Sequence, residues 1–331
     1  MDFSYLPKIE LHLHLDCSLS YKVVQQIDPS ISIEEYEHSF IAPPKCNDLV
    51  DFLTRAVKGF ELMQTPEQLR IVTLDLLEQL DADNVIYAEI RFAPLLHIAK
   101  GLTAEQVVVI INDAINEGRS KYKVEARLIL CTLRNYNEEQ SLLTVKLVEQ
   151  FAGTNVVGFD IAGDEAGFPI DAHKKAFAYA KEKAIHCTAH AGEASGPKSV
   201  YETIEHFHPT RIGHGVRSAE DENLLSLLKE KDIHLEVCPT SNVQTNICNN
   251  LEDHSVDRIY KKGVSLSINC DARTISNITL SAEYAGLARV FGWQKAQFLH
   301  CNLEGLRHSF ADNATKEKIG KQLELAYQNS L

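Results

Sequence analysis

Two histidines stand two residues apart in the segment KIELHLHLD, near the start of the chain. Side chains two residues apart on a β-strand point to the same face, so His12 and His14 would present both imidazoles at one level of a sheet. Two imidazoles on one face suit a metal ion better than apolar packing. His190 and Glu193, in the segment TAHAGE, could add a third nitrogen and a carboxylate. These spacings therefore suggest metal binding and proton transfer.

Two more polar residues end apolar segments later in the chain. His214 is flanked by glycines in RIGHG, and Asp271 closes SINCD. Each alone also fits a structural role, such as a core histidine or a helix N-cap. Together, three imidazole nitrogens and one carboxylate suit Zn²⁺ with a position left for water, and such a metal lowers the pKa of that water to about 7. Glu193 and His214 would then remain to handle protons.

The elements that must position these side chains alternate between strand and helix. Short apolar segments predict strands at 9–14, 85–92, 125–132, 156–162, 186–191, 211–214, 233–237 and 265–269. Periodic segments predict helices at 65–82, 103–117, 138–152, 171–183, 198–205 and 221–229. Eight strands alternating with helices over about 260 residues match a closed (β/α)8 TIM barrel of the α/β class. An open doubly wound sheet is the alternative, but no GxGxxG or GxxxxGK[ST] motif supports it.

A barrel would bring the ends of its first, fifth, sixth and eighth strands, which carry these polar residues, to one mouth. The segment at about 17–84 separates the first two predicted strands and has helical patterning on both sides of Pro43 and Pro44. We expect it to form a helical lid insertion over the C-terminal face of a single domain spanning 1–331. The tail, 295–331, has helical spacing and is expected to pack outside the barrel.

Composition excludes several kinds of partner. The 331 residues carry a formal net charge of −13 and no basic cluster longer than a pair, so we expect neither a polynucleotide nor a membrane as a partner. No apolar run approaches the roughly 18 residues of a membrane span, and the N-terminus lacks the pattern of a secretory signal. Eight cysteines without a C-x-x-C pair indicate reduced thiols, so we expect a cytoplasmic protein.

Five segments in a fixed order carry a family resemblance. PKIELHLHLD, DIAGDE, TAHAGE, RIGHG and the strand ending in Asp271 resemble the adenosine deaminase family of zinc amidohydrolases, from residue 7 to about 271. The resemblance implies a (β/α)8 barrel, one Zn²⁺ per chain and hydrolytic deamination of a purine. The matching zinc ligands are His12, His14, His190 and Asp271.

The same resemblance implies roles for the residues around the metal. Glu193 matches the residue that protonates N1 of the purine while hydroxide attacks C6, and His214 matches the residue that orients the water and helps move its proton. Gly163 matches a glycine whose backbone N–H meets purine N3, and Asp16 matches the carboxylate that binds ribose hydroxyls. The apolar helical gate over the nucleoside corresponds to Leu49, Phe52 and Leu53.

This sequence departs from the family pattern after the eighth strand. The family usually has a second aspartate there, which donates to purine N7, whereas this chain has Ala272. A buried acceptor left unpartnered costs about 1–3 kcal/mol. We hypothesise that Arg273, Thr274 or a water supplies the missing donor. Asp16 favours a nucleoside over a free base, since the adenine-specific relatives tend to carry glutamate at this position.

Four functions stay open from the sequence. The leading one is deamination of adenosine, and of 2′-deoxyadenosine, to inosine and ammonia in purine salvage. The same chemistry on adenine or on a modified adenosine such as aminodeoxyfutalosine is the runner-up, because of Ala272. A metallo-esterase or lactonase commonly carries a carboxylated lysine on the fourth strand, and 156–165 contains no lysine. A non-catalytic barrel is the last alternative. The sequence does not predict the oligomeric state.

Overall fold

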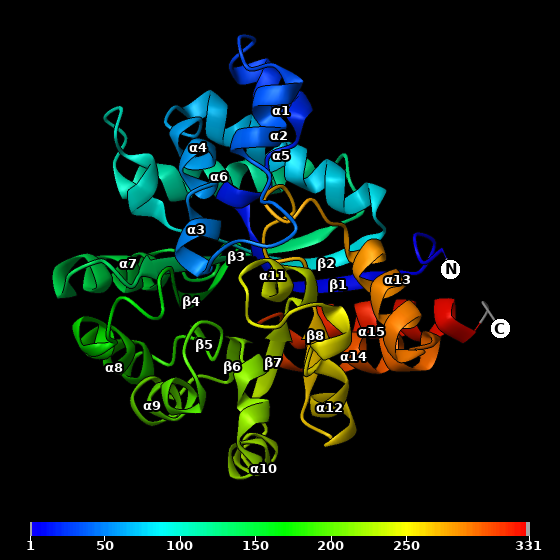
Figure 1. Ribbon diagram of the computed structural model, residues 1–331. Helices are drawn as coiled ribbons and strands as arrows, with labels where there is room; N and C mark the ends of the chain where they lie inside the picture. Colours follow the sequence, from blue (N-terminus) through cyan, green and yellow to red (C-terminus); the bar gives the residue numbers. More distant parts are fainter. Residues whose placement is uncertain (1, 329–331) are drawn as a thin grey trace.

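Eight parallel strands form the centre of the structure, a computed structural model that describes residues 2–328 (Figure 1). They are β1 (Lys8–His14), β2 (Val85–Phe92), β3 (Glu125–Leu133), β4 (Val156–Ala162), β5 (Thr188–Ala191), β6 (Arg211–His214), β7 (His234–Val237) and β8 (Leu266–Ile268). Strands β1 to β4 and β5 to β8 form two sheets, which bridges join at Phe159–Cys187 and at Leu13–Asp271. The strands therefore close into the predicted barrel.

Helices cover the outside of the barrel, and the longer ones begin at good caps. They are α5 (Pro66–Ala82), α6 (Ala104–Gly118), α7 (Glu138–Gln150), α8 (Lys174–Glu182), α9 (Pro197–Phe207), α10 (Glu222–Glu230), α14 (Lys295–His308) and α15 (Asn313–Gln328). Thr103 and Asn137 form capping boxes at the starts of α6 and α7, which satisfy backbone N–H groups there. The six predicted barrel helices are present, and α14 and α15 confirm the helical tail.

Three helices after β7 were not among those predicted: α11 (Pro239–Gln244), α12 (Val256–Lys261) and α13 (Leu280–Phe291). Five short 3-10 turns complete the elements: η1 (Leu15–Cys17), η2 (Pro94–His97), η3 (Asp171–His173), η4 (Val216–Glu220) and η5 (Leu251–Asp253). The turn η1 follows β1 directly and carries Asp16, so the first residues after a strand end already contribute to the barrel mouth.

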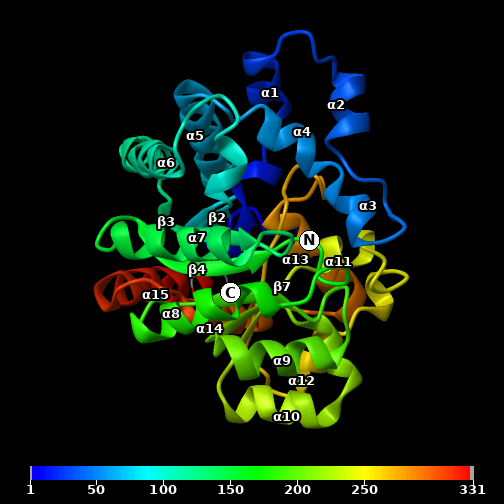
Figure 2. The same cartoon turned by 90° about the vertical axis from the view of Figure 1, so that its left-hand side faces the viewer.

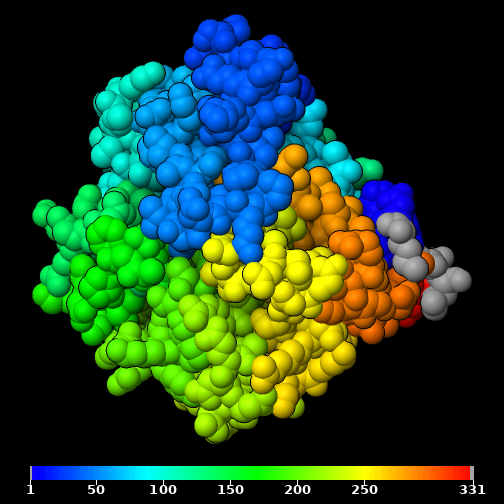
Figure 3. Space-filling model, viewed as in Figure 1, coloured from blue at the N-terminus to red at the C-terminus, as the bar shows by residue number. Residues whose placement is uncertain are grey.

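The segment between β1 and α5 holds four short helices: α1 (Tyr21–Ile27), α2 (Ile33–Ser39), α3 (Leu49–Leu53) and α4 (Ala56–Glu61). Figure 2 shows α1 and α2 standing clear of the barrel, with α3 and α4 nearer to it. In Figure 3 the chain near α3 meets the segment after α11. Two backbone hydrogen bonds attach the chain just before α3 to the rest of the structure. They run from Ala42 N to Ile275 O and from Cys46 N to Gln244 O, both at 2.8 Å.

The strands are buried on both faces, as their apolar sequences require, but the barrel interior also holds charges. Its fully buried ionisable side chains include Glu89, Arg91, Asp160, Arg211 and Glu236. Within residues 2–328, no helix combines the length and apolarity needed to cross a bilayer. All eight cysteines are free thiols, as predicted.

Candidate active site

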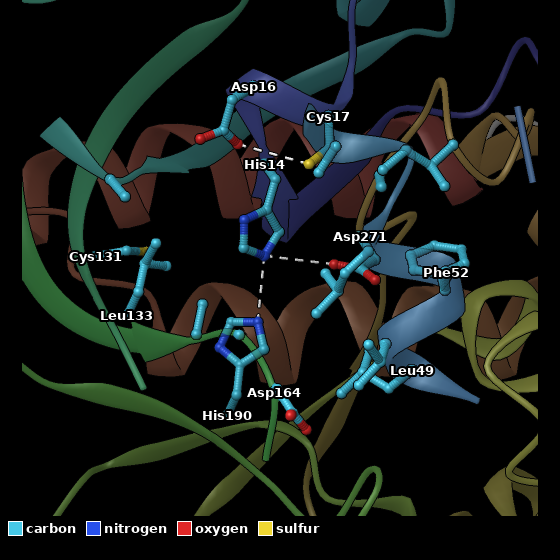
Figure 4. A pocket seen from close by; sticks show the side chains of 18 of the residues that line it. His14, Asp16, Cys17, Leu49, Phe52, Cys131, Leu133, Asp164, His190 and Asp271 are labelled. Atoms are coloured by element: carbon cyan, nitrogen blue, oxygen red, sulfur yellow. Dashed lines mark hydrogen bonds and ion pairs between the residues drawn. The ribbon is translucent and has the colours of Figure 1, made fainter. Parts of the chain in front are cut away.

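A cavity of about 420 Å³ opens at the C-terminal ends of the strands, a volume typical of small-molecule sites. Residues from the strand ends and from α3 and α4 line it, and Figure 4 shows Leu49 and Phe52 of α3 beside the strand-end residues. The predicted site residues that line it are His14, Asp16, Leu49, Phe52, Leu53, Gly163, His190, Glu193, His214 and Asp271. Residues spread over most of the chain therefore meet at one mouth.

A cluster of imidazoles and one carboxylate lies at the bottom of this cavity. One ligand atom from each of His12, His190, His214 and Asp271 lies within 4.8 Å of the others. His14 joins them, since its Nε2 is 3.2 Å from His190 Nε2 and 3.4 Å from Asp271 Oδ1. Figure 4 shows His14, His190 and Asp271 pointing toward one another.

Backbone strain accompanies the cluster at two strand ends. His214 has a φ of 60° and Asp271 a φ of 65°, in the left-handed region that non-glycine residues rarely adopt. Such a conformation costs on the order of 1–3 kcal/mol and persists where the surrounding structure enforces it. Both residues lie on the cavity, which is where strained residues concentrate in functional sites.

Two buried carboxylates set the tautomers of two of these histidines. His12 Nδ1 lies 2.8 Å from Glu236 Oε2, and His190 Nδ1 lies 3.1 Å from Asp160 Oδ2. An ionised carboxylate only accepts, so both rings carry a proton on Nδ1, and each ring in its neutral form leaves Nε2 with a lone pair. His12 Nε2 is buried without a hydrogen-bond partner. An orphaned lone pair aimed at other ligand atoms fits a metal ion.

One guanidinium holds both carboxylates behind the histidines. Arg91 donates to Asp160 Oδ2 and to Glu236 Oε2, each at 2.7 Å, and is itself fully buried. Burial opposes ionisation of Glu236, but the charges of Arg91 and Arg211 outweigh it and hold the pKa of that carboxyl well below its usual range. The carboxylates of Asp160 and Glu236, which lie behind the histidines, are therefore ionised hydrogen-bond acceptors.

Asp271 is held ionised beside the histidines. Ser241 Oγ donates to its Oδ2 at 2.7 Å, while its Oδ1 lies 3.3 Å from His12 Nε2. Burial opposes ionisation, but the nearby rings of His12, His214 and His14 outweigh it and hold the pKa of Asp271 well below its usual value. Three imidazole nitrogens and this oxygen form a donor set suited to Zn²⁺.

Glu193 differs from Asp271 in its protonation. Burial, followed by the charges of Asp271 and Glu165, raises the pKa of Glu193 well above its usual value, which favours the protonated carboxylic acid. Its Oε2 lies 3.5 Å from His214 Nε2. Glu165 stabilises the loop that carries Glu193, because its carboxylate accepts hydrogen bonds from the N–H groups of Gly192 and Glu193 at 2.7 and 3.0 Å. Two carboxyl groups with opposite protonation are what acid–base catalysis needs.

Two further residues on the cavity can contact a ligand. Burial raises the pKa of Asp16 to about 6, and His97 Nε2 lies 3.8 Å from its Oδ2. Gly163 has a φ of 99°, which L side chains rarely adopt, so a glycine is required where its backbone borders the cavity.

Arg273 does not reach the cavity, contrary to the hypothesis that it contacts the substrate. Its guanidinium binds Asp83 and lies 3.5 Å from Glu10, because two buried carboxylates attract it away from the mouth. Thr274 also turns away, donating to Leu19 O at 2.6 Å. Ala272 lines the cavity and packs in an apolar cluster with residues of α3, so no side chain there replaces the missing donor.

The sequence analysis did not identify four residues that position the site: Arg91, Asp160, Glu165 and Glu236. Three of them stand within apolar strand segments, where a charged residue is buried and must have a partner. That signal was available in VIYAEIRF, VVGFDIA and HLEV. Glu165 lies in DEAG, directly after a strand, and its partners are backbone groups that no sequence pattern names.

Comparisons with known proteins identify the family of the chain. The family model for adenosine deaminase matches residues 7–325. The chain is 37% identical to an adenosine deaminase of Clostridium botulinum (strain Loch Maree) over 96% of this chain and 97% of that protein. Two solved structures share the fold. An Arabidopsis protein complexed with IMP has a TM-score of 0.88 at 24% identity, covering 99% of each chain. A zinc-bound amidohydrolase from Burkholderia ambifaria has a TM-score of 0.89 at 22% identity, covering 98% of this chain and 92% of that one.

The family model and the Clostridium relative both extend over nearly the whole chain, barrel and mouth included. This protein is thus an aminohydrolase enzyme of the adenosine deaminase family.

Proposed function

We propose that this protein hydrolyses adenosine and 2′-deoxyadenosine at C6, giving inosine or 2′-deoxyinosine and ammonia. The observation that carries the proposal is Glu193, with a pKa raised by burial, beside a His/Asp cluster in a cavity that neither lysine nor arginine of the described residues lines. A proton donor, a metal-binding donor set and a cavity without lysine or arginine suit the deamination of an uncharged purine.

One Zn²⁺ per chain would be held by His12, His14, His190 and Asp271. The bare Nε2 of His12 and of His190 and the ionised Asp271 support this set. A zinc ion there supplies a nucleophilic water oxygen at neutral pH. The zinc-bound Burkholderia structure is in keeping with this metal.

The chain's own residues handle the protons. Glu193 donates its proton to N1, which draws electron density from C6 and makes that carbon electrophilic. The water oxygen, oriented by His214, then attacks C6, and the ionised Glu193 takes the released proton. Passing that proton to the 6-amino nitrogen lets it leave as ammonia. The C6 hydroxyl then becomes a carbonyl and returns its proton to Glu193, which is again an acid. Water has then supplied the oxygen on C6, the proton on N1 and the third hydrogen of ammonia.

Other residues bind and enclose the nucleoside. The backbone N–H of Gly163 would meet N3, and Asp16 would accept a hydrogen bond from a ribose hydroxyl. Leu49, Phe52 and Leu53 of α3 form an apolar wall over the cavity, which would exclude water and strengthen the polar contacts inside. We propose on this basis that α1 to α4 act as the lid.

The charge of the cavity favours a neutral substrate. Its lining, all within the described residues, includes Asp16, Asp164 and Glu193 but neither lysine nor arginine. A phosphate, as in IMP, or the carboxylate of aminodeoxyfutalosine would meet no cation to pair with. Adenine is also neutral, but it would leave Asp16 without a hydroxyl partner. Nucleosides are therefore the best-supported substrates.

A substrate panel tests this proposal. We expect the highest kcat/KM with adenosine and 2′-deoxyadenosine, lower values with adenine, and little turnover of AMP or aminodeoxyfutalosine, followed by the ultraviolet change on deamination. Glu193→Gln should retain about one zinc per chain and lose about 10²- to 10⁴-fold in kcat. Glu205→Gln, on the exposed face of α9, is the matched control. Preference for AMP, or full activity of Glu193→Gln, would contradict the proposal.

A further inference from the structure

A buried line of hydrogen bonds runs from the backbone of α12 to His214. Val256 N lies 3.0 Å from His254 Nδ1, and His254 Nε2 lies 3.2 Å from Asn242 Oδ1. Asn242 Nδ2 in turn lies 3.1 Å from His214 Nδ1. All three side chains are buried, with Asn242 fully inaccessible. His254 and Asn242 therefore have these partners and little access to water.

The direction of each hydrogen bond follows from its first member. A backbone N–H can only donate, so His254 Nδ1 accepts. Burial lowers the pKa of His254 to about 4, so at neutral pH the ring is neutral and carries its one proton on Nε2. That proton is donated to Asn242 Oδ1, which turns the amide N–H toward His214. His214 Nδ1 must then accept, and the proton of the neutral His214 ring lies on Nε2.

We propose that Asn242 and His254 are positioning residues that fix His214 as the Nε2–H tautomer. His214 then faces the reacting oxygen as a hydrogen-bond donor and acts neither as a base nor as a metal ligand. The inference rests on the proposed function for the identity of the reacting oxygen. His12 and His190 have the opposite tautomer, with the proton on Nδ1, because carboxylates lie behind them.

This arrangement divides the work at the site. The N–H of His214 stabilises the negative charge that develops on the attacking oxygen, which is the usual role of a fixed donor. The carboxylate of Glu193, whose Oε2 lies 3.5 Å from His214 Nε2, would then receive the proton from that oxygen. The resemblance implied that His214 helps to move that proton. A His214 ring that accepts at Nδ1 and already carries a proton on Nε2 does not receive it.

Nitrogen-15 NMR of the histidine rings in the full-length, zinc-loaded protein reads the tautomer directly. The signals of His214 are identified by their loss in His214→Gln. We expect a protonated Nε2 and a bare Nδ1 for His214 in the absence of substrate. A proton on Nδ1, or on both nitrogens at neutral pH, overturns the proposal.

Variants test whether the two residues act through the tautomer. Asn242→Asp places an acceptor against Nδ1, so His214 should gain a proton there and kcat should fall on the order of 10²-fold with zinc retained. Asn223→Asp, the same change on the exposed start of α10, should alter neither. His254→Phe should mix the tautomers, and His254→Gln, which keeps an N–H donor, should restore Nε2–H and most of kcat. A folded Asn242→Asp with the native tautomer and native kcat refutes the assignment.

The outcome is separable from the proposed function. The tautomer is measured without substrate, so an Nε2–H ring in a protein that fails to deaminate nucleosides leaves this inference standing. Adenosine turnover by a protein whose His214 carries its proton on Nδ1 supports the proposed function and overturns the inference.

Discussion

Replacing Arg91 by methionine should damage metal binding from a position that touches no metal ligand. The guanidinium donates to Asp160 and Glu236 at 2.7 Å each and to Leu11 O at 2.6 Å. Methionine keeps much of the volume but leaves two buried carboxylates short of a counter-charge. Removing one partner of a buried ion pair costs about 3–5 kcal/mol.

This loss of unfolding free energy should lower the melting temperature by a measurable amount. Unfolding entropy of about 2.1 cal/mol/K per residue gives roughly 0.7 kcal/mol/K for a chain of this length, so Arg91→Met should lower Tm by about 4–7 °C. The uncompensated carboxylates should also retain a proton on the imidazoles of His12 and His190, because an imidazolium restores the lost positive charge. A metal must displace that proton, so we expect zinc affinity to fall about 10- to 100-fold.

Calorimetry and competition with a chelator measure the two effects. Arg273→Met is the matched control, because Arg273 is also buried, between the carboxylates of Asp83 and Glu10, but contacts neither Asp160 nor Glu236. It should lose similar stability and keep its zinc affinity. If Arg91→Met melts lower but binds zinc as tightly as the native protein, the reasoning about the histidine partners is wrong.

Three further predictions concern the loop, the substrate and the pH dependence of stability. Glu165→Gln turns an amide N–H toward backbone donors and should lower kcat about 5- to 150-fold with zinc content unchanged, by metal analysis. Ala272→Asn introduces a donor beside the cavity and should lower KM for adenosine, measured against 7-deazaadenosine, which lacks N7 and should gain nothing. Burial lowers the pKa of His97 and of His254 to about 4, below the unfolded value near 6.5. The unfolded state then binds more protons, so stability present above pH 6.5 should fall by about 3 kcal/mol per group as pH drops toward 4, and His97→Phe should flatten that dependence in urea unfolding.

The barrel and its mouth could be predicted because their signals are local. Each strand is an apolar run, and the polar residue at its end stands out against it, as His214 does in RIGHG. All eight predicted strands are present, with ends shifted by one or two residues. The helices α11, α12 and α13 were missed because each is short or amphipathic and lies in a segment with mixed turn signals, where tertiary packing decides the conformation.

The direction of a side chain could not be predicted from the same signals. Arg273 follows Asp271 by two residues, and nothing in CDART shows that Asp83, nearly two hundred residues earlier, captures its guanidinium. The tautomer of His214 is equally non-local, because it depends on a backbone N–H at Val256. Sequence spacing identifies which residues share a site, whereas hydrogen-bond direction requires the three-dimensional contacts.

The composition of the barrel interior gives an independent reason to expect a divalent cation. One buried network joins four acidic side chains, Glu89, Asp160, Glu236 and Asp271, to only two guanidinium groups, those of Arg91 and Arg211. The neighbouring buried network of Lys8, Glu10, Asp83 and Arg273 has two acidic and two basic side chains. Because an uncompensated buried charge is costly, the excess of acidic groups in the first network favours bound protons or a divalent cation there. The imidazole nitrogens of His12, His14 and His190 at its end suit the metal.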